Sequence, residues 1–196
     1  MRCAAGVARC YGRAVSEPEA RPLLFLDVDG TVLPVGDAKQ PLTLEAWYAE
    51  WQHPDNPQLA AIDPSLGPRL LGLGCELWWA TAWMDDANPV IAPLLGVPAL
   101  PVARMGELPD VKDEIFADDD ERAPLSWKTT ALVALAAGRP FIWLDDELTE
   151  TDRTWVAENH PGPALLLRVD STRGLRHEEL DGVAAWIGSL ATEAHH

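Results

Sequence analysis

Compact apolar runs alternate along this chain with segments of helical periodicity. Runs typical of buried strands lie at 23–26, 75–80, 99–103, 141–144 and 164–169. Segments typical of helices lie between or after them, at 64–73, 88–95, 126–137, 149–159 and 176–190. Strands that alternate with helices predict a parallel sheet with right-handed crossovers and helices on both faces. We therefore expect a three-layer, Rossmann-like α/β fold with a parallel sheet of about five strands.

Capping residues predict where several of these helices begin. Asn88 followed by Pro89 is typical of an N-cap and first helical residue, and Ser126 is a second N-cap candidate. Thr149 and Asp152 have the spacing of a capping box. Glycines that follow the periodic residues predict the ends of the first two helices.

The length of 196 residues and the spacing of the elements predict one domain over 23–190. Residues 1–22 and 191–196 are expected to be flexible tails. A proline-rich insertion at 34–62, with a brief helix expected at 44–51, is too short to form a second domain.

Composition narrows the class of protein. The chain is 47% hydrophobic and 23% charged, which is typical of soluble globular proteins, and it lacks an apolar run long enough to cross a membrane. Its formal net charge of -16 disfavours nucleic-acid partners. Three cysteines without metal-ligand spacing indicate a reduced, cytoplasmic protein. The acidic run at 107–121 predicts a solvated loop, with a second cation site or an acidic docking surface as alternatives.

The first apolar run leads directly into the strongest candidate for chemistry. Asp27 and Asp29 follow Leu23-Leu24-Phe25-Leu26, and Gly30-Thr31 comes next. The carboxyl ends of parallel strands are where active-site loops gather. Strand alternation would direct both carboxylates to one side, and Gly30 would allow a sharp turn with backbone N–H groups exposed to an anion. Two carboxylates this close repel each other unless a cation or a shared proton intervenes.

The sequence Asp27-Val28-Asp29-Gly30-Thr31 resembles the first motif of the haloacid dehalogenase (HAD) superfamily. Three later positions resemble the other motifs of that superfamily: Thr81 after a strand, Lys128 near a helix start, and Asp145-Asp146 after a strand. The resemblance covers four short motifs and the pattern of elements between them. An acid at position 29 resembles the phosphatases and phosphomutases of the superfamily. The small insertion at 34–62 resembles a minimal cap, which implies an open or nearly open site.

The resemblance implies a Mg²⁺-dependent phosphatase that acts on a small-molecule phosphomonoester through an aspartyl-phosphate. Asp27 would be the nucleophile, Asp29 the general acid and base, and Thr81 and Lys128 would hold the phosphoryl group. The expected metal ligands are Asp27, Asp29 and Asp146, with Asp145 as the partner behind Asp146, although the reverse order of the last two is also open. Expected substrate contacts come from Gly30, Thr31, Ala82 and Trp83.

Several interpretations remain open on sequence alone. Trp83 is favoured as a core residue over a substrate-stacking one, and Asp170 as a loop cap over an active-site partner. The chain as a whole is alternatively a non-catalytic HAD-like binding or scaffold protein, or a phosphatase that processes nucleic-acid ends. Neither the identity of the substrate nor the oligomeric state follows from the sequence.

Overall fold

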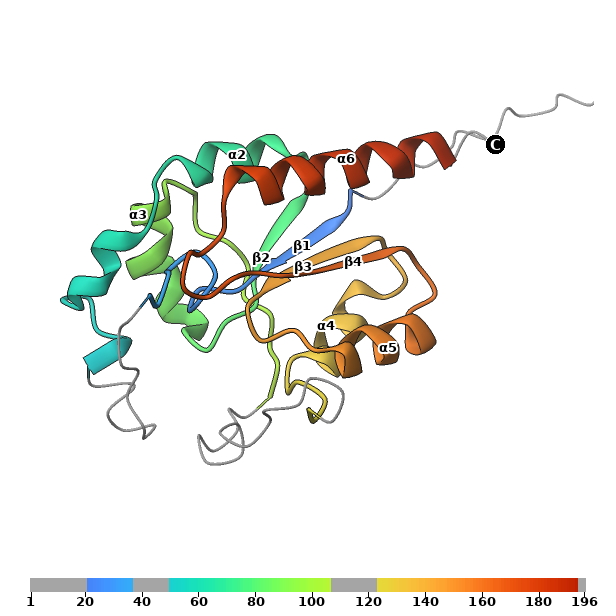
Figure 1. The fold of residues 1–196 in the computed structure, drawn as a ribbon, viewed down its shortest axis with the longest axis horizontal. Coiled ribbons are helices and arrows are strands. Elements are labelled where there is room, and N and C mark those ends of the chain that lie inside the picture. Colours follow the sequence, from blue (N-terminus) through green and yellow to red (C-terminus); the bar gives the residue numbers. More distant parts are fainter. Residues whose placement is uncertain (1–20, 37–49, 107–122, 194–196) are drawn as a thin grey trace, which may run out of the picture.

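A four-stranded parallel sheet lies at the centre of the molecule (Figure 1). The computed structural model describes residues 21–36, 50–106 and 123–193, and every structural statement below concerns these ranges. The strands are β1 (Leu23–Leu26), β2 (Glu76–Trp79), β3 (Phe141–Asp145) and β4 (Ala164–Arg168), in the spatial order β2-β1-β3-β4. The central strands β1 and β3 are buried along their whole length, whereas the edge strand β4 is only partly buried. The predicted α/β class with a parallel sheet is confirmed.

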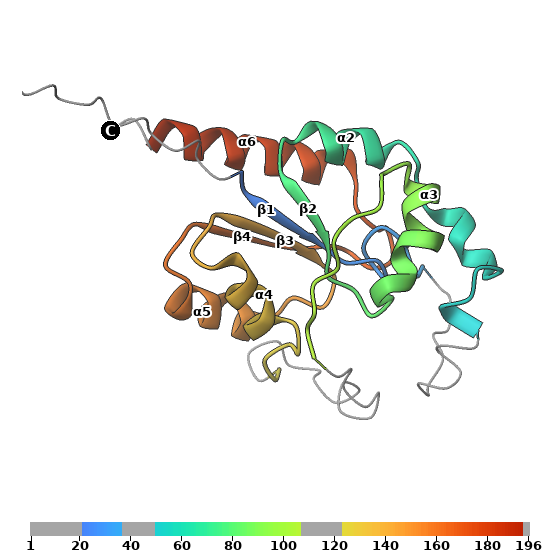
Figure 2. The same cartoon turned by 180° about the vertical axis from the view of Figure 1, so that it is seen from behind.

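Helices cover both faces of this sheet and make a layered, Rossmann-like arrangement (Figures 1 and 2). One face carries α2 (Leu66–Gly72) and α6 (His177–Glu193), and the other carries α4 (Thr129–Ala136) and α5 (Glu150–Asn159). A short 3-10 helix η3 (Met84–Asp86), the π-helical turn η4 (Ala87–Ile91) and α3 (Ala92–Leu95) follow β2. A further 3-10 helix, η2 (Pro57–Ala61), comes before α2.

The alternation of side chains along the strands builds two cores. Leu24 and Leu26 of β1 pack in a cluster with Leu70 of α2 and with Leu180 and Val183 of α6. The residues between them face the other way, because successive strand side chains point to opposite faces. Leu23 and Phe25 therefore pack with the residues contributed by α4 and α5. Burial on both faces is the reason for the unbroken apolar runs in the sequence.

The predicted strand at 99–103 does not join the sheet as a strand. Trp79 makes an isolated parallel bridge with Val102, through hydrogen bonds of its amide and carbonyl to Pro101 and Ala103. Pro98 and Pro101 have no amide hydrogen, so this segment lacks donors that a longer ladder needs. The expected sheet of about five strands is thus a sheet of four.

The helix starts are only partly as predicted. The capping box of Thr149 and Asp152 is present at the start of α5. Ser126 is not the N-cap of α4, because Lys128 occupies that position and Ser126 Oγ accepts a hydrogen bond from the Lys128 amide. Asn88 is not an N-cap either: it lies inside η4, where its side chain accepts hydrogen bonds from Trp79 Nε1 and the Leu100 amide.

Several sequence predictions fall outside the described residues. These are the tail up to residue 20, the part of the insertion at 37–49 with most of its expected helix at 44–51, the whole acidic run at 107–121, and the last three residues. Within the described ranges, none of the helices is both long and apolar enough to span a bilayer.

Candidate functional site

The loop that follows β1 carries the first candidate carboxylate to the carboxyl edge of the sheet. β1 ends at Leu26, and the Asp27 amide still donates to the Leu144 carbonyl of β3 over 3.1 Å. Gly30 then turns the chain with a φ of +69°, a conformation that side chains disfavour. A Cβ on Gly30 would lie 2.1 Å from Asp146 Oδ2. Glycine is therefore required both for the turn and for the close approach of Asp146.

The turn uses its own amides. The Gly30 amide donates to the Leu33 carbonyl at 2.9 Å, and the Thr31 amide donates to the Val28 carbonyl at 3.1 Å. Thr31 is fully buried, and its hydroxyl has no hydrogen-bond partner among the described residues. The amides of Gly30 and Thr31 are thus engaged within the turn rather than exposed for an anion, which corrects that part of the expectation.

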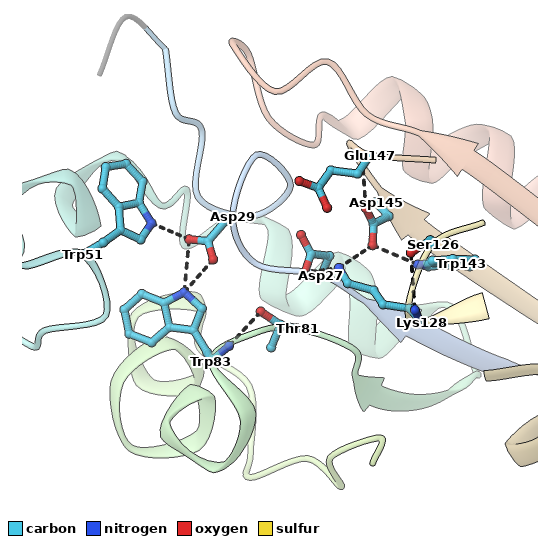
Figure 3. A network of polar contacts seen from close by, with 10 residues as sticks. All are labelled: Asp27, Asp29, Trp51, Thr81, Trp83, Ser126, Lys128, Trp143, Asp145 and Glu147. Atoms are coloured by element: carbon cyan, nitrogen blue, oxygen red, sulfur yellow. Dashed lines mark hydrogen bonds and ion pairs between the residues drawn. The ribbon is translucent and has the colours of Figure 1, made fainter. Parts of the chain in front are cut away.

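Lys128 joins the loops after β1 and β3 (Figure 3). Its Nζ donates to Asp27 Oδ1 at 2.9 Å and to Asp145 Oδ2 at 2.7 Å, and the lysine is 3% exposed. Burial by itself lowers the pKa of Lys128, but the charges of Asp145 and Asp27 outweigh it and raise the pKa well above its ordinary value. A cation at the N-cap of α4 is disfavoured by the helix dipole. The carboxylates of Asp27 and Asp145 compensate for this and hold the ammonium group of Lys128 in place.

Asp145 has its hydrogen-bonding capacity filled by neighbouring protein groups. Trp143 Nε1 donates to Asp145 Oδ2 at 3.0 Å, beside Lys128, and the Glu147 amide donates to Asp145 Oδ1 at 3.0 Å. Asp146 differs, because no other described residue donates a hydrogen bond to its carboxylate. The two adjacent acids at the end of β3 therefore have different surroundings.

Asp27, Asp145 and Asp146 bring carboxylate oxygens within 4.8 Å of one another. Burial raises the pKa of Asp27 well above its ordinary value, and the charges of Asp145 and Asp146 add to the effect. Burial, followed by the charges of Asp145 and Glu147, raises the pKa of Asp146 to about 8. Three clustered carboxylates face one ammonium group, so a small divalent cation with a preference for oxygen fits the excess negative charge.

Asp29 belongs to a separate part of the site. Trp51 Nε1 donates to its Oδ1 at 2.7 Å, and Trp83 Nε1 lies 3.1 Å from Oδ1 and 3.0 Å from Oδ2. Strand alternation was expected to direct Asp27 and Asp29 to one side, but β1 ends at Leu26, so both residues lie beyond the strand, and Asp29 has indole partners of its own. Burial raises the pKa of Asp29 to about 6, against the two indole hydrogen bonds, which lower it.

The loop after β2 places the remaining predicted residues beside β1. The Ala80 amide donates to the Leu26 carbonyl at 2.9 Å, so Thr81 lies next to the loop that carries Asp27. Thr81 is fully buried, and its Oγ1 accepts a 3.3 Å hydrogen bond from the Trp83 amide. Trp83 is a buried core residue, as favoured, with a polar role through Asp29. Ala82 is partly exposed.

The predicted open site stays a prediction, because residues 37–49 of the insertion lie outside the described residues, but the groups around Lys128 are enclosed whereas Asp29 and Asp146 are partly exposed. Asp27 is 4% exposed, and Thr81 and Lys128 are equally enclosed. Trp51, from the insertion, lies beside Asp29 and donates to its carboxylate. Asp170 does not reach the site: its Oδ1 accepts hydrogen bonds from the amide and hydroxyl of Thr172, as expected for a loop cap.

Two kinds of site residue had no signal in the sequence. Trp51 and Trp143 donate to the acidic side chains, yet a tryptophan in an insertion or in a strand is normally an apolar packing residue.

Comparisons with protein families, with curated proteins and with solved structures found no match. The function of this chain therefore has to be argued from the geometry of the site.

Proposed function

We propose that this chain is a Mg²⁺-dependent phosphomonoester hydrolase of the HAD type, acting through an aspartyl-phosphate on Asp27. The observation that carries the proposal is the position of Lys128, whose Nζ bridges Asp27 and Asp145 while Asp146 lies within reach of both. A buried nucleophile, a fixed cation and an oxygen-rich cluster at one sheet edge are the parts that phosphoryl transfer needs.

The metal would be held by Asp27 and Asp146, together with the backbone carbonyl of Asp29 as the resemblance implies. Asp145 is the weaker ligand, because its oxygens already accept from Lys128, Trp143 and the Glu147 amide. Its role is to position Lys128. Bound Mg²⁺ supplies positive charge that neutralises the carboxylates and the phosphoryl oxygens.

Each residue of the site then has its own role in the reaction. A carboxylate oxygen of Asp27 forms a bond to phosphorus while the bond from phosphorus to the ester oxygen breaks. Asp29 donates its proton to the leaving alcohol, and it takes a proton from the water that subsequently releases inorganic phosphate from Asp27. Lys128 Nζ and the Thr81 hydroxyl hold the phosphoryl oxygens.

The surroundings of Asp29 suit this exchange of a proton. A pKa of about 6 leaves Asp29 close to balance between its two protonation states near neutral pH. The two indole hydrogen bonds fix the direction of its carboxylate. Since neither Trp51 nor Trp83 takes up a proton, they orient the acid without competing for its chemistry.

The enclosure of Asp27 favours a small ester over a polymer. With 4% of Asp27 exposed, the surroundings of its carboxylate leave little room for a bulky substrate. The charge of -16 opposes approach of a nucleic acid in addition. We therefore favour a small phosphomonoester over a phosphorylated nucleic-acid end.

Hydrolysis of p-nitrophenyl phosphate tests the proposal. We expect release of p-nitrophenol in Mg²⁺ and a loss of at least about 100-fold when the metal is removed with EDTA, because the carboxylate cluster then repels the dianionic ester. Restoration by added Mg²⁺ is the control. Activity that ignores both treatments contradicts the proposal. A screen of phosphomonoesters without turnover, alongside specific retention of a protein partner, favours the binding protein instead.

Mg²⁺ is expected to stabilise the protein more strongly at pH 8 than at pH 5. The pKa of Asp146 is raised to about 8 in the folded chain, so the folded state binds more protons than the unfolded state between about pH 4 and 8. Stability without metal therefore falls as pH rises through this window, by up to about 1.4 kcal/mol per pH unit. Mg²⁺ binds the ionised carboxylate of Asp146 and therefore offsets this loss of stability.

Thermal unfolding with and without Mg²⁺ at several pH values measures the effect. At saturating metal we expect the Tm to rise by about 5 °C or more at pH 8 and by much less at pH 5. KCl at equal ionic strength controls for screening, and Asp146→Asn should remove most of the rise. An increment that is independent of pH contradicts the assignment of Asp146.

A further inference from the structure

Asp152 is a fully buried carboxylate that lies outside the cluster of acidic site residues. It is 0% exposed and belongs to the first turn of α5, where it completes the capping box with Thr149. Its Oδ2 accepts hydrogen bonds from the Thr149 amide at 3.0 Å and from the Thr149 hydroxyl at 2.8 Å. These bonds satisfy donors at the start of a single helix. The other carboxylate oxygen of Asp152 therefore remains for a different partner.

That other oxygen holds the turn that carries Lys128. Asp152 Oδ1 accepts hydrogen bonds from the Ser126 amide at 2.9 Å and from the Thr129 hydroxyl at 2.5 Å. The turn is closed by a hydrogen bond of its own, from the Thr129 amide to the Ser126 carbonyl at 3.1 Å. Figure 3 shows Ser126 next to Lys128, whose amide donates to the Ser126 hydroxyl. One oxygen atom of α5 thus fixes both ends of the short segment from which the Lys128 side chain enters the site.

The start of α4 depends on this carboxylate from the neighbouring helix. Lys128 is the N-cap residue of α4, and its side chain makes no capping hydrogen bond. A lysine side chain has no acceptor to offer to the first amides of a helix. The negative charge of Asp152 is favourable near the positive end of the helix dipole, where the charge of Lys128 is unfavourable. Asp152 therefore serves the N-terminal ends of α4 and α5, which lie side by side on one face of the sheet (Figure 1).

The burial of Asp152 is compensated by hydrogen bonds alone. All four hydrogen bonds to its carboxylate among the described residues come from uncharged groups, two amides and two hydroxyls. A buried carboxylate costs free energy unless such bonds are made. Thr129 is also 0% exposed, so its bond to Asp152 is formed away from water. Movement of the Lys128 turn away from Asp152 is therefore opposed.

We propose that Asp152 is a positioning residue for Lys128. By holding both ends of the turn, it sets where the ammonium group meets the phosphoryl oxygens. The bonds of Asp152 go to residues on either side of Lys128 and not to the ammonium group itself. The effect on catalysis rests on the proposed function, in which Lys128 holds the phosphoryl group. Misplacement of such a group by about 1 Å can cost about 100-fold in rate.

Hydrogen exchange of the Lys128 ammonium group tests its position directly. Lys39, Lys112 and Lys128 are the lysines of the sequence, so in ¹⁵N-lysine-labelled protein the ammonium signal of Lys128 is the one that Lys128→Met removes. Its two buried ion pairs protect this group from exchange with water. Thr129→Val keeps the shape of the side chain and removes the hydroxyl donor to Asp152. We expect this variant to raise the exchange rate of the Lys128 ammonium by about tenfold or more.

Thr149→Val is the matched control, because it removes a hydroxyl donor to the same carboxylate from the α5 side. It should lower the Tm through loss of the cap and leave the exchange of Lys128 unchanged. Thr129→Ser keeps the hydroxyl and should also leave the exchange unchanged. If Thr129→Val does not fold, Asp152→Asn replaces it, with the same rise expected. An exchange rate that stays at the wild-type value, or an equal rise in Thr149→Val, overturns the inference.

Hydrolysis of p-nitrophenyl phosphate measures the consequence for catalysis. Below the unfolding temperature of every variant, Thr129→Val should lower kcat by about tenfold or more, whereas Thr149→Val and Thr129→Ser should retain wild-type turnover. If the wild-type protein hydrolyses no ester, the proposed function fails, and hydrogen exchange still decides whether Asp152 positions Lys128. If the wild type is active and Thr129→Val retains its kcat, the proposed function stands and the positioning role of Asp152 is overturned.

Discussion

Asp27→Asn is expected to abolish phosphomonoester hydrolysis while making the metal-free protein more stable. The amide cannot form the covalent intermediate, so kcat should fall by about 10⁴-fold or more. The same change removes one of three clustered carboxylates: burial raises the pKa of Asp27, and the charges of Asp145 and Asp146 add to the effect. Lys128 retains its 2.7 Å contact with Asp145, so its charge stays paired in the variant.

The gain in stability should be about 1–2 kcal/mol at pH 8, which corresponds to a rise in Tm of about 2–8 °C for a chain of this size. The gain should shrink toward pH 5. Because burial raises the pKa of Asp27, a falling pH favours the neutral carboxyl group in the folded wild-type protein, and replacing it by an amide then gains less. Mg²⁺ should stabilise the variant less than the wild type, since one of the expected ligands is gone.

Steady-state hydrolysis and thermal unfolding on the same preparations measure both effects. Glu158→Gln is the matched control, because it removes one negative charge from an exposed position of α5. That control should leave activity unchanged and shift the Tm little. A variant that retains substantial hydrolysis contradicts the role of Asp27. Loss of activity with an unfolded or strongly destabilised protein contradicts the account of like-charge repulsion.

The fold was predictable where local pattern and burial agree. The apolar runs at β1 and β3 are uninterrupted because both faces of these strands are covered, and the capping box at Thr149 satisfies backbone donors without help from distant residues. The segment at 99–103 has a similar apolar pattern but contains Pro101, which removes a donor from the ladder. The hydrophobic pattern alone does not show that this donor is missing, so it predicts a fifth strand that the sheet in the described residues does not contain.

The residues of the candidate site that follow strand ends were predictable, whereas the contacts between residues far apart in the sequence were not. Asp27, Lys128 and Asp145 converge as the order of parallel strands requires. The contacts from Trp51 and Trp83 to Asp29 span 22 and 54 positions, and no local rule connects an indole to a distant carboxylate. These two contacts hold the Asp29 carboxylate, and the size of the insertion alone could not predict them.

Lys128→Met should have the second large effect, on activity and on stability together. Methionine keeps an apolar side chain of similar length and removes the cation that lies 2.9 Å from Asp27 and 2.7 Å from Asp145. Loss of a positive charge aimed at the phosphoryl oxygens typically reduces kcat by about 10²- to 10³-fold. Removing one partner of a buried ion pair typically costs about 3–5 kcal/mol, because the other charge remains buried without compensation.

The stability penalty of Lys128→Met should depend on pH in a defined direction. Lys128 lowers the pKa of Asp27 against burial, which raises it, so without the lysine this carboxyl holds its proton to a higher pH. The folded variant then binds more protons than its unfolded state over a wider range, and its stability falls as pH rises. We expect a small penalty at pH 5 and a larger one at pH 8.

Urea unfolding at both pH values, with and without Mg²⁺, measures this penalty. Arg104→Met is the matched control: Arg104 pairs with Asp85 at 2.8 Å, but both side chains are more than two-thirds exposed, so the cost should stay below about 1 kcal/mol at either pH. Mg²⁺ should restore part of the stability of Lys128→Met, because a second source of positive charge reaches the same carboxylates, without restoring turnover. A penalty of equal size at pH 5 and pH 8 would instead mean that Lys128 acts through packing of its alkyl chain, and that the charge balance at the end of β1 and β3 does not govern this site.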